Sequence, residues 1–122
     1  MIGYTTVGTN DLKRAAGFYD ALLAELGAKR AMEMETFIAW ATAPNTPMVA
    51  IIKPFDKQPA TVGNGVMVAL LASSKEQVDK IHKKALELGG KDEGAPGQRG
   101  EGFYAGYFRD LDGNKLNAFF MG

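Results

Sequence analysis

The final quarter of the chain constrains the fold most strongly. Two segments rich in aromatic residues, 103–109 and 115–120, flank the short sequence Asp112-Gly113-Asn114. Gly and Asn readily adopt the positive φ angles that tight hairpin turns require, and aromatic residues favour strands. The sequence therefore predicts a β-hairpin, with Asp110 and Asp112 as structural acceptors for the backbone amides of its turn.

The order of the predicted elements repeats once along the chain. A strand is followed by an amphipathic helix and by further strands, and the plan starts again after a linker that contains Pro and Gly (54–64). The segments Leu26-Gly27 and Leu88-Gly89 end the two helix patterns alike. We predict strands at 1–7, 29–34, 36–42, 48–53 and 66–71, helices near 11–26 and 74–89, a mobile glycine-rich loop at 94–102, and then the hairpin.

The composition excludes several classes of protein. With 122 residues, 46% of them hydrophobic, the chain can build one compact domain. Its net charge is zero, so nucleic acid and anionic membranes are not expected as partners. Cysteine is absent, which rules out disulfides and thiolate metal sites. Without a signal-like segment or a long apolar stretch, we expect a cytoplasmic protein.

Three segments in this order carry a resemblance to a known family: the opening 1–12, the run Gly17-Phe18-Tyr19-Asp20-Ala21-Leu22-Leu23, and the Asp112-Gly113-Asn114 hairpin. Together they resemble the vicinal-oxygen-chelate superfamily, which includes glyoxalase I, bleomycin-resistance proteins and extradiol dioxygenases. The resemblance implies an α+β fold of two βαβββ modules, about 1–55 and 60–122, within a single domain over 1–122. Their curved sheets would form an incompletely closed mixed β-barrel with the helices outside. Relatives commonly pair across a two-fold axis, so we expect a homodimer.

The same resemblance implies positions for a divalent cation, which these proteins hold through His or Glu. In this chain those positions fall at Tyr4, Met67 and Asn117, and on the strand 48–53, which has neither an acid nor a histidine. A phenol, a thioether and an amide are poor substitutes for imidazole and carboxylate ligands. We therefore predict no metal site and no cofactor.

Aromatic and polar residues near the expected cleft are candidates for holding a small-molecule ligand. Trp40 lies on a strand that can line the concavity. Tyr104 and Tyr107 point to opposite faces of the hairpin, one toward a helix and the other toward the cleft. Arg99, in the predicted loop, can clamp a carboxylate or phosphate group. The candidate ligand-binding set is Tyr4, Trp40, Met67, Arg99, Tyr104, Tyr107 and Asn117.

Three functions stay open at this point. The leading hypothesis is a metal-free protein that binds a small organic molecule. The second is a lyase or isomerase resembling glyoxalase I, whose general base would be Glu33 or Glu35, which alternation places on one strand face. The third is an interaction module. His82, the only histidine, is predicted at the surface or boundary of its helix, away from the chemistry.

Overall fold

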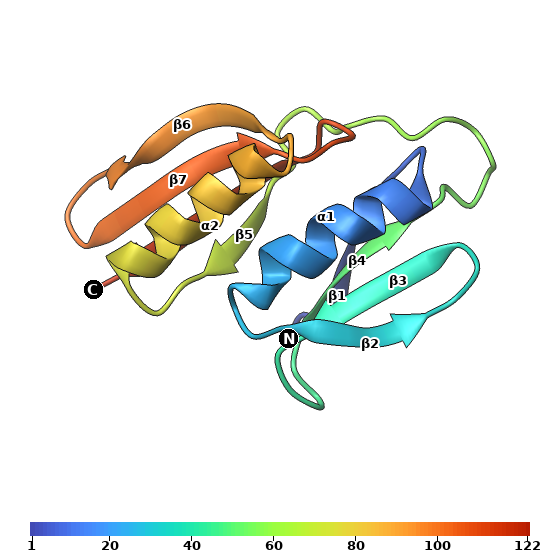
Figure 1. The fold of residues 1–122 in the computed structure, drawn as a ribbon, viewed down its shortest axis with the longest axis horizontal. Helices are drawn as coiled ribbons and strands as arrows, with labels where there is room; N and C mark the ends of the chain where they lie inside the picture. The colour runs from blue at the N-terminus through green and yellow to red at the C-terminus, as the bar shows by residue number, and fades with distance from the viewer. The chain divides into compact units, whose positions relative to one another are not determined.

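The computed structural model describes all 122 residues and divides them into two compact units, Met1–Val62 and Gly63–Gly122. Each unit contains a strand, a helix and three further strands, in that order (Figure 1). This arrangement confirms the predicted α+β fold of two βαβββ modules. Neither helix is long and apolar enough to cross a membrane.

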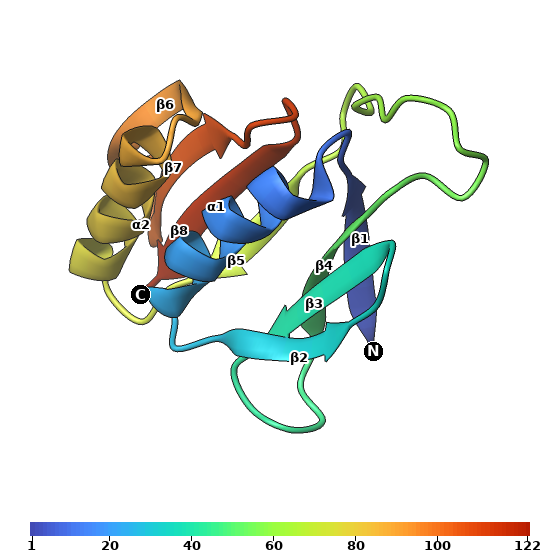
Figure 2. The same ribbon diagram turned by 45° about the vertical axis from the view of Figure 1, so that its right-hand side comes forward.

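The N-terminal unit is a four-stranded mixed sheet with one helix packed on it. Its strand order is β1-β4-β3-β2, with β1 parallel to β4 and the other pairs antiparallel (Figure 2). The elements are β1 (Tyr4–Gly8), α1 (Leu12–Ala24), β2 (Lys29–Glu33), β3 (Phe37–Ala41) and β4 (Met48–Ile52).

Helix α1 begins and ends where the sequence predicts. The Asp11 side chain caps its first turn by accepting a hydrogen bond from the amide of Arg14 at 3.0 Å. The chain leaves the helix through Gly27, whose φ of +77° suits glycine. Between these ends, small and apolar residues at helical spacing are buried: Ala15, Ala16, Phe18, Tyr19, Leu22 and Leu23.

The C-terminal unit repeats this plan, and the three strands that follow its helix are longer than those of the first unit. Its order is β5-β8-β7-β6, with β5 parallel to β8, and α2 packs on β6, β7 and β8 (Figure 2). The elements are β5 (Val68–Leu71), α2 (Lys75–Glu87), β6 (Lys91–Gln98), β7 (Phe103–Arg109) and β8 (Lys115–Met121).

The glycine-rich segment is not the mobile loop predicted for residues 94–102, because strand β6 continues through it to Gln98. The pairing of β6 with β7 shifts register around Gly94 and Gly97, which marks bulges. Strand β6 lies at the sheet edge, where Pro96 is tolerated because edge strands leave amides unpaired. Glycine and proline in this segment therefore shape an edge strand.

His82 is buried, with 5% of its surface exposed, and the prediction of a surface or boundary residue is wrong. Its Nε2 lies 3.1 Å from Asp92 Oδ1, and its ring meets that of Phe108 at a centroid distance of 6.2 Å. Gly106 leaves room for it, since a Cβ there would lie 3.3 Å from His82 Cδ2. The nearby lysines hid the burial of His82 in the sequence pattern, although His82 lies one helical turn after the buried Val78.

The hairpin between β7 and β8 confirms the structural role predicted for Asp110. Asp110 Oδ1 accepts hydrogen bonds from the amides of Asp112 and Asn114, and Asp110 Oδ2 accepts one from Asn114 Nδ2, each at 2.9 Å. Gly113 has a φ of +90°. Asp110 is also buried, and its carboxylate holds the turn together through these three hydrogen bonds.

Candidate functional site

Trp40 establishes which face of the N-terminal sheet is covered by its helix. The indole Nε1 donates a hydrogen bond to Asp20 Oδ1 on α1 at 2.9 Å, and the ring lies 5.7 Å from that of Tyr19. Only 2% of Trp40 is exposed. It belongs to the packing between helix and sheet, contrary to the expectation that it lines the concave side.

The centre of the opposite face of this sheet is apolar, although strand pairing also places the exposed Thr6 and Lys29 on it. Strand residues alternate between faces, so Phe37 and Ala39 point away from α1. Ala50 packs with them, and the half-buried Met48 and Ile52 extend the cluster. Tyr4 ends the face, 57% exposed, with its ring edge-on to Phe37 at 5.9 Å. We call this surface the N-terminal helix-free face: Tyr4, Phe37, Ala39, Met48, Ala50 and Ile52.

At the end of β4 this face borders a cavity of about 680 Å³. The segment after β4 forms its wall and is tethered by Asn10, whose amide accepts from Ala60 N at 2.6 Å and donates to Ala60 O at 3.3 Å. Phe55, on that wall, is 99% exposed. The lining combines apolar and polar groups, including Thr36, Ile52, Pro54, Phe55, Lys57 and Pro59.

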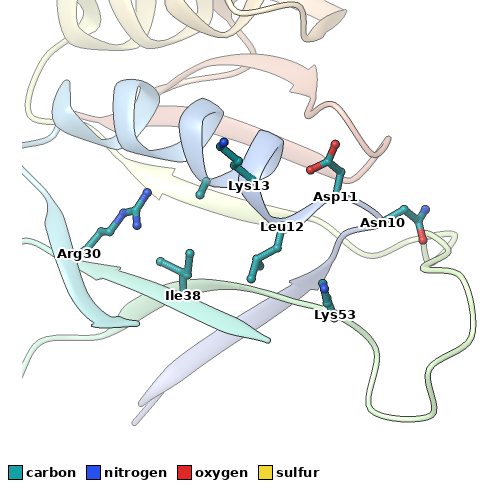
Figure 3. A pocket seen from close by; sticks show the side chains of 8 residues that line it. Asn10, Asp11, Leu12, Lys13, Arg30, Ile38 and Lys53 are labelled. Carbon is teal, nitrogen blue, oxygen red and sulfur yellow. The ribbon is translucent and has the colours of Figure 1, made fainter. Parts of the chain in front are cut away.

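A second hollow, of about 520 Å³, lies on the helix side between the start of α1 and strand β3. Figure 3 shows Leu12 and Ile38 between Arg30 at one end and Lys53 at the other. Arg30 is held by Asp20, at 2.9 and 2.7 Å, and by Glu33, at 2.6 Å. The hydrogen bond from Arg30 keeps the pKa of Asp20 below its usual value. None of the predicted site residues lines this groove.

Glu33 and Glu35 do not share a strand face as predicted. Glu33 ends β2 and accepts the hydrogen bond from Arg30. Glu35 lies in the turn that follows, where Met34 and Phe37 bond to each other through their backbones. The hairpin turn interrupts the alternation, so the structure gives no support to a proton-transfer pair.

Tyr104 and Tyr107 lie on opposite faces of β7, as alternation predicts. The Tyr104 hydroxyl donates to Asp79 Oδ1 on α2 at 2.6 Å, which raises the pKa of Tyr104. Tyr107 therefore points away from α2, and its direct partner on β8 is Asn117. Of the two tyrosines, only Tyr107 faces away from the helix.

Charged and polar groups gather around Tyr107. The Arg99 guanidinium carbon and the Lys115 Nζ each lie 5.5 Å from its ring centroid. Asn117 is only 1% exposed, and its Oδ1 has no hydrogen-bond partner. Met67 precedes β5 and is partly exposed. We call this surface the C-terminal helix-free face: Ala69, Arg99, Ala105, Tyr107, Lys115, Asn117 and Phe119.

The residues at the expected metal positions do not fit a divalent cation. Tyr4 offers a phenol, Met67 a thioether and Asn117 a neutral amide, whereas Zn, Mn and Fe sites use imidazole and carboxylate donors. Strand β4 supplies only aliphatic side chains and Met48. The structure contains no group of three or more His, Cys, Asp or Glu that could hold a metal ion.

Sequence reasoning missed most residues of these faces, among them Phe37, Ile52 and Lys115. The signal that could have found them is the two-residue period of their strands. Once Trp40 is assigned to the helix side, Phe37 must lie on the other face. Lys115 follows in the same way, because it precedes Asn117 by two residues.

Comparison with known proteins agrees with this fold. The family model described as Glyoxalase/Bleomycin resistance protein/Dioxygenase superfamily matches residues 1–118. A crystal structure of a glyoxalase/bleomycin resistance protein from Albidiferax ferrireducens T118 is 38% identical, with a TM-score of 0.90, over 98% of this chain and 97% of that one. No protein with a curated function matches.

More distant structures share the fold. A hypothetical protein from S. aureus is 27% identical, with a TM-score of 0.75, over 98% of this chain and 92% of that one. A lactoylglutathione lyase from Agrobacterium tumefaciens is 20% identical, with a TM-score of 0.70 and the same coverage of both chains. From the family match, the two βαβββ modules and the similarity to the first structure, we conclude that this chain belongs to the glyoxalase/bleomycin resistance protein/dioxygenase superfamily.

Proposed function

We propose that this protein binds a small organic molecule whose apolar part contacts the N-terminal helix-free face and enters the adjoining cavity. The observation that carries the proposal is the position of Ile52, which belongs both to the apolar face and to the cavity lining. The cavity volume of about 680 Å³ lies within the range typical of small-molecule sites.

Exposed rings supply the driving force for binding. Phe55 is almost completely exposed, and Tyr4 is more than half exposed. When a ligand covers an exposed apolar side chain, the free energy of binding becomes more favourable by about 25 cal/mol per Å² of apolar surface buried. The Tyr4 hydroxyl can also orient a polar group on the ligand.

We further propose that this binding needs no divalent cation. The donors at the expected metal positions are neutral, and methionine sulfur is a soft ligand that favours Cu(I) over Zn, Mn or Fe. A thioether, a phenol and an amide instead suit dispersion contacts and hydrogen bonds with an organic ligand. The lyase alternative has less support, because Glu33 is engaged by Arg30 and Glu35 lies in a turn.

A neutral fluorescent probe tests the apolar site. N-phenylnaphthylamine should bind the wild-type protein, and Ile52→Lys should weaken binding at least about tenfold, because a bound apolar ring would desolvate the new ammonium group. Phe55→Ala should weaken binding about threefold to tenfold without changing the melting temperature, since Phe55 makes little contact with the folded protein.

Leu86→Lys on α2 is the matched control, because it places the same charge at a partly exposed apolar position in the other unit. It should leave the affinity for the probe within about twofold of the wild type. If Ile52→Lys and Phe55→Ala both bind the probe as tightly as this control, the N-terminal face and its cavity are not the site.

A further inference from the structure

We propose that the C-terminal helix-free face recognises a small organic carboxylate that also carries a hydrogen-bond donor. The face lies on the other unit from the apolar cavity, so this site stands on its own observations. Three features carry the proposal: a preorganised arginine, a lysine on the same aromatic ring, and a buried amide oxygen without a partner.

Arg99 is held in place although it follows the end of β6. Its Nη2 donates to the carbonyl oxygen of Ala95 at 2.5 Å, and its guanidinium lies over Tyr107. A Cβ at Gly97 would lie 2.9 Å from Arg99 Nη1, and one at Gly94 would lie 3.3 Å from Nη2. The side chain therefore folds back along the strand over two glycines, which leave it the space.

Neither cation at Tyr107 forms an ion pair within 4.0 Å, whereas Arg109 on the same face binds Glu93 at 2.7 Å. The contact with Arg109, with a smaller contribution from the charge of Lys115, lowers the pKa of Glu93 and keeps it charged. The two unpaired positive charges beside one ring are suited to an anionic group, and guanidinium binds carboxylates especially well.

Asn117 supplies the second, independent observation. It is the direct cross-strand partner of both Tyr107 and Ala69, and it is almost fully buried. Its Oδ1 has no hydrogen-bond partner. An unpaired buried acceptor is unfavourable, and an O–H or N–H group on a ligand would satisfy it.

The spacing along β8 indicates the size of the ligand. Lys115 and Asn117 are two residues apart on one face, which places their backbone positions about 7 Å apart. A benzene ring with a carboxylate and a hydroxyl at para positions spans a similar distance. The same ring can make an edge contact with Tyr107, whose ring centroid lies 5.5 Å from both cations.

The test compares three probes by calorimetry and by amide NMR of β7 and β8: para-hydroxybenzoate, its neutral amide, and benzoate. We expect para-hydroxybenzoate to bind at least about tenfold more tightly than the amide. The double variant R99Q/K115Q should reduce that ratio to below about threefold while leaving the affinity for the amide unchanged. The single variant Arg99→Lys should keep most of the preference for the acid over the amide, because it keeps the positive charge.

Asn117→Leu keeps the size of the side chain and removes the acceptor. It should therefore weaken the binding of para-hydroxybenzoate about tenfold and leave the binding of benzoate unchanged. Ile52→Lys should leave binding of all three probes unchanged, which separates this site from the proposed apolar site. The control K80Q/K83Q removes two exposed charges from α2 and should change nothing.

Equal affinity of the wild type for the acid and the amide would overturn the proposal. So would an unchanged acid preference in R99Q/K115Q, or binding too weak to detect at about 10 mM probe.

Discussion

Replacing Trp40 by alanine should lower the free energy of unfolding by about 3–5 kcal/mol, the usual range for removing a large aromatic side chain from a core. The indole is 2% exposed, packs on Tyr19 and donates to Asp20. Its removal leaves a cavity between α1 and β3 and deprives the Asp20 carboxylate of one donor. Urea unfolding followed by circular dichroism measures the effect without relying on the only tryptophan.

Trp40→Phe is the matched control. It retains most of the apolar volume and loses the hydrogen bond, so we expect a smaller loss of about 1–2 kcal/mol. A loss below about 1 kcal/mol for Trp40→Ala would mean that the indole is not part of the core.

Asp110→Ala should destabilise the protein by about 3 kcal/mol, because a buried carboxylate that accepts several hydrogen bonds is lost. The amides of Asp112 and Asn114 and the side-chain amide of Asn114 would all lose this acceptor. Urea unfolding reports the change in stability, and amide NMR reports whether β7 and β8 still pair at Arg109 and Lys115.

Asp110→Asn provides the graded comparison. Its remaining carbonyl oxygen can accept from the backbone amides, but its NH₂ group cannot accept from Asn114 Nδ2. We expect Asp110→Asn to lower the free energy of unfolding by less than Asp110→Ala does. If Asp110→Ala is as stable as the wild type, the turn does not depend on this carboxylate.

The parts of the fold that the sequence predicted rest on local patterns. Helix α1 was predicted from apolar residues at helical spacing, closed by Gly27, and the β7–β8 turn from Asp112-Gly113-Asn114. Residues near in sequence make the decisive contacts in both: the Asp11 cap reaches Arg14, and Asp110 reaches Asn114. The family resemblance added the order of the two modules.

The direction of side chains across the sheets was harder to predict. Alternation separates Tyr104 from Tyr107, but it does not say which of them meets the helix. That choice depends on Asp79, 25 positions away, and for Trp40 on Asp20, 20 positions away. Contacts between residues so far apart in the sequence cannot be predicted from the alternation within one strand.

Strand β6 was missed for a different reason. Glycine and proline normally disfavour strands, and only pairing with β7 at a sheet edge overrides that preference at Gly94, Pro96 and Gly97. The arginine that follows was consequently interpreted as a mobile clamp. The structure instead shows Arg99 folded back on Ala95 and Tyr107.

The measurement that tests the central claim most directly is a titration of metal-stripped protein with N-phenylnaphthylamine, repeated after addition of Zn, Ni, Mn or Fe(II). We propose that the N-terminal helix-free face binds an organic ligand without a metal, so the dissociation constant should agree within about twofold in all samples. Elemental analysis after dialysis should find no stoichiometric metal. The account would be contradicted if binding required one equivalent of tightly held metal that Tyr4→Ala or Asn117→Ala removes.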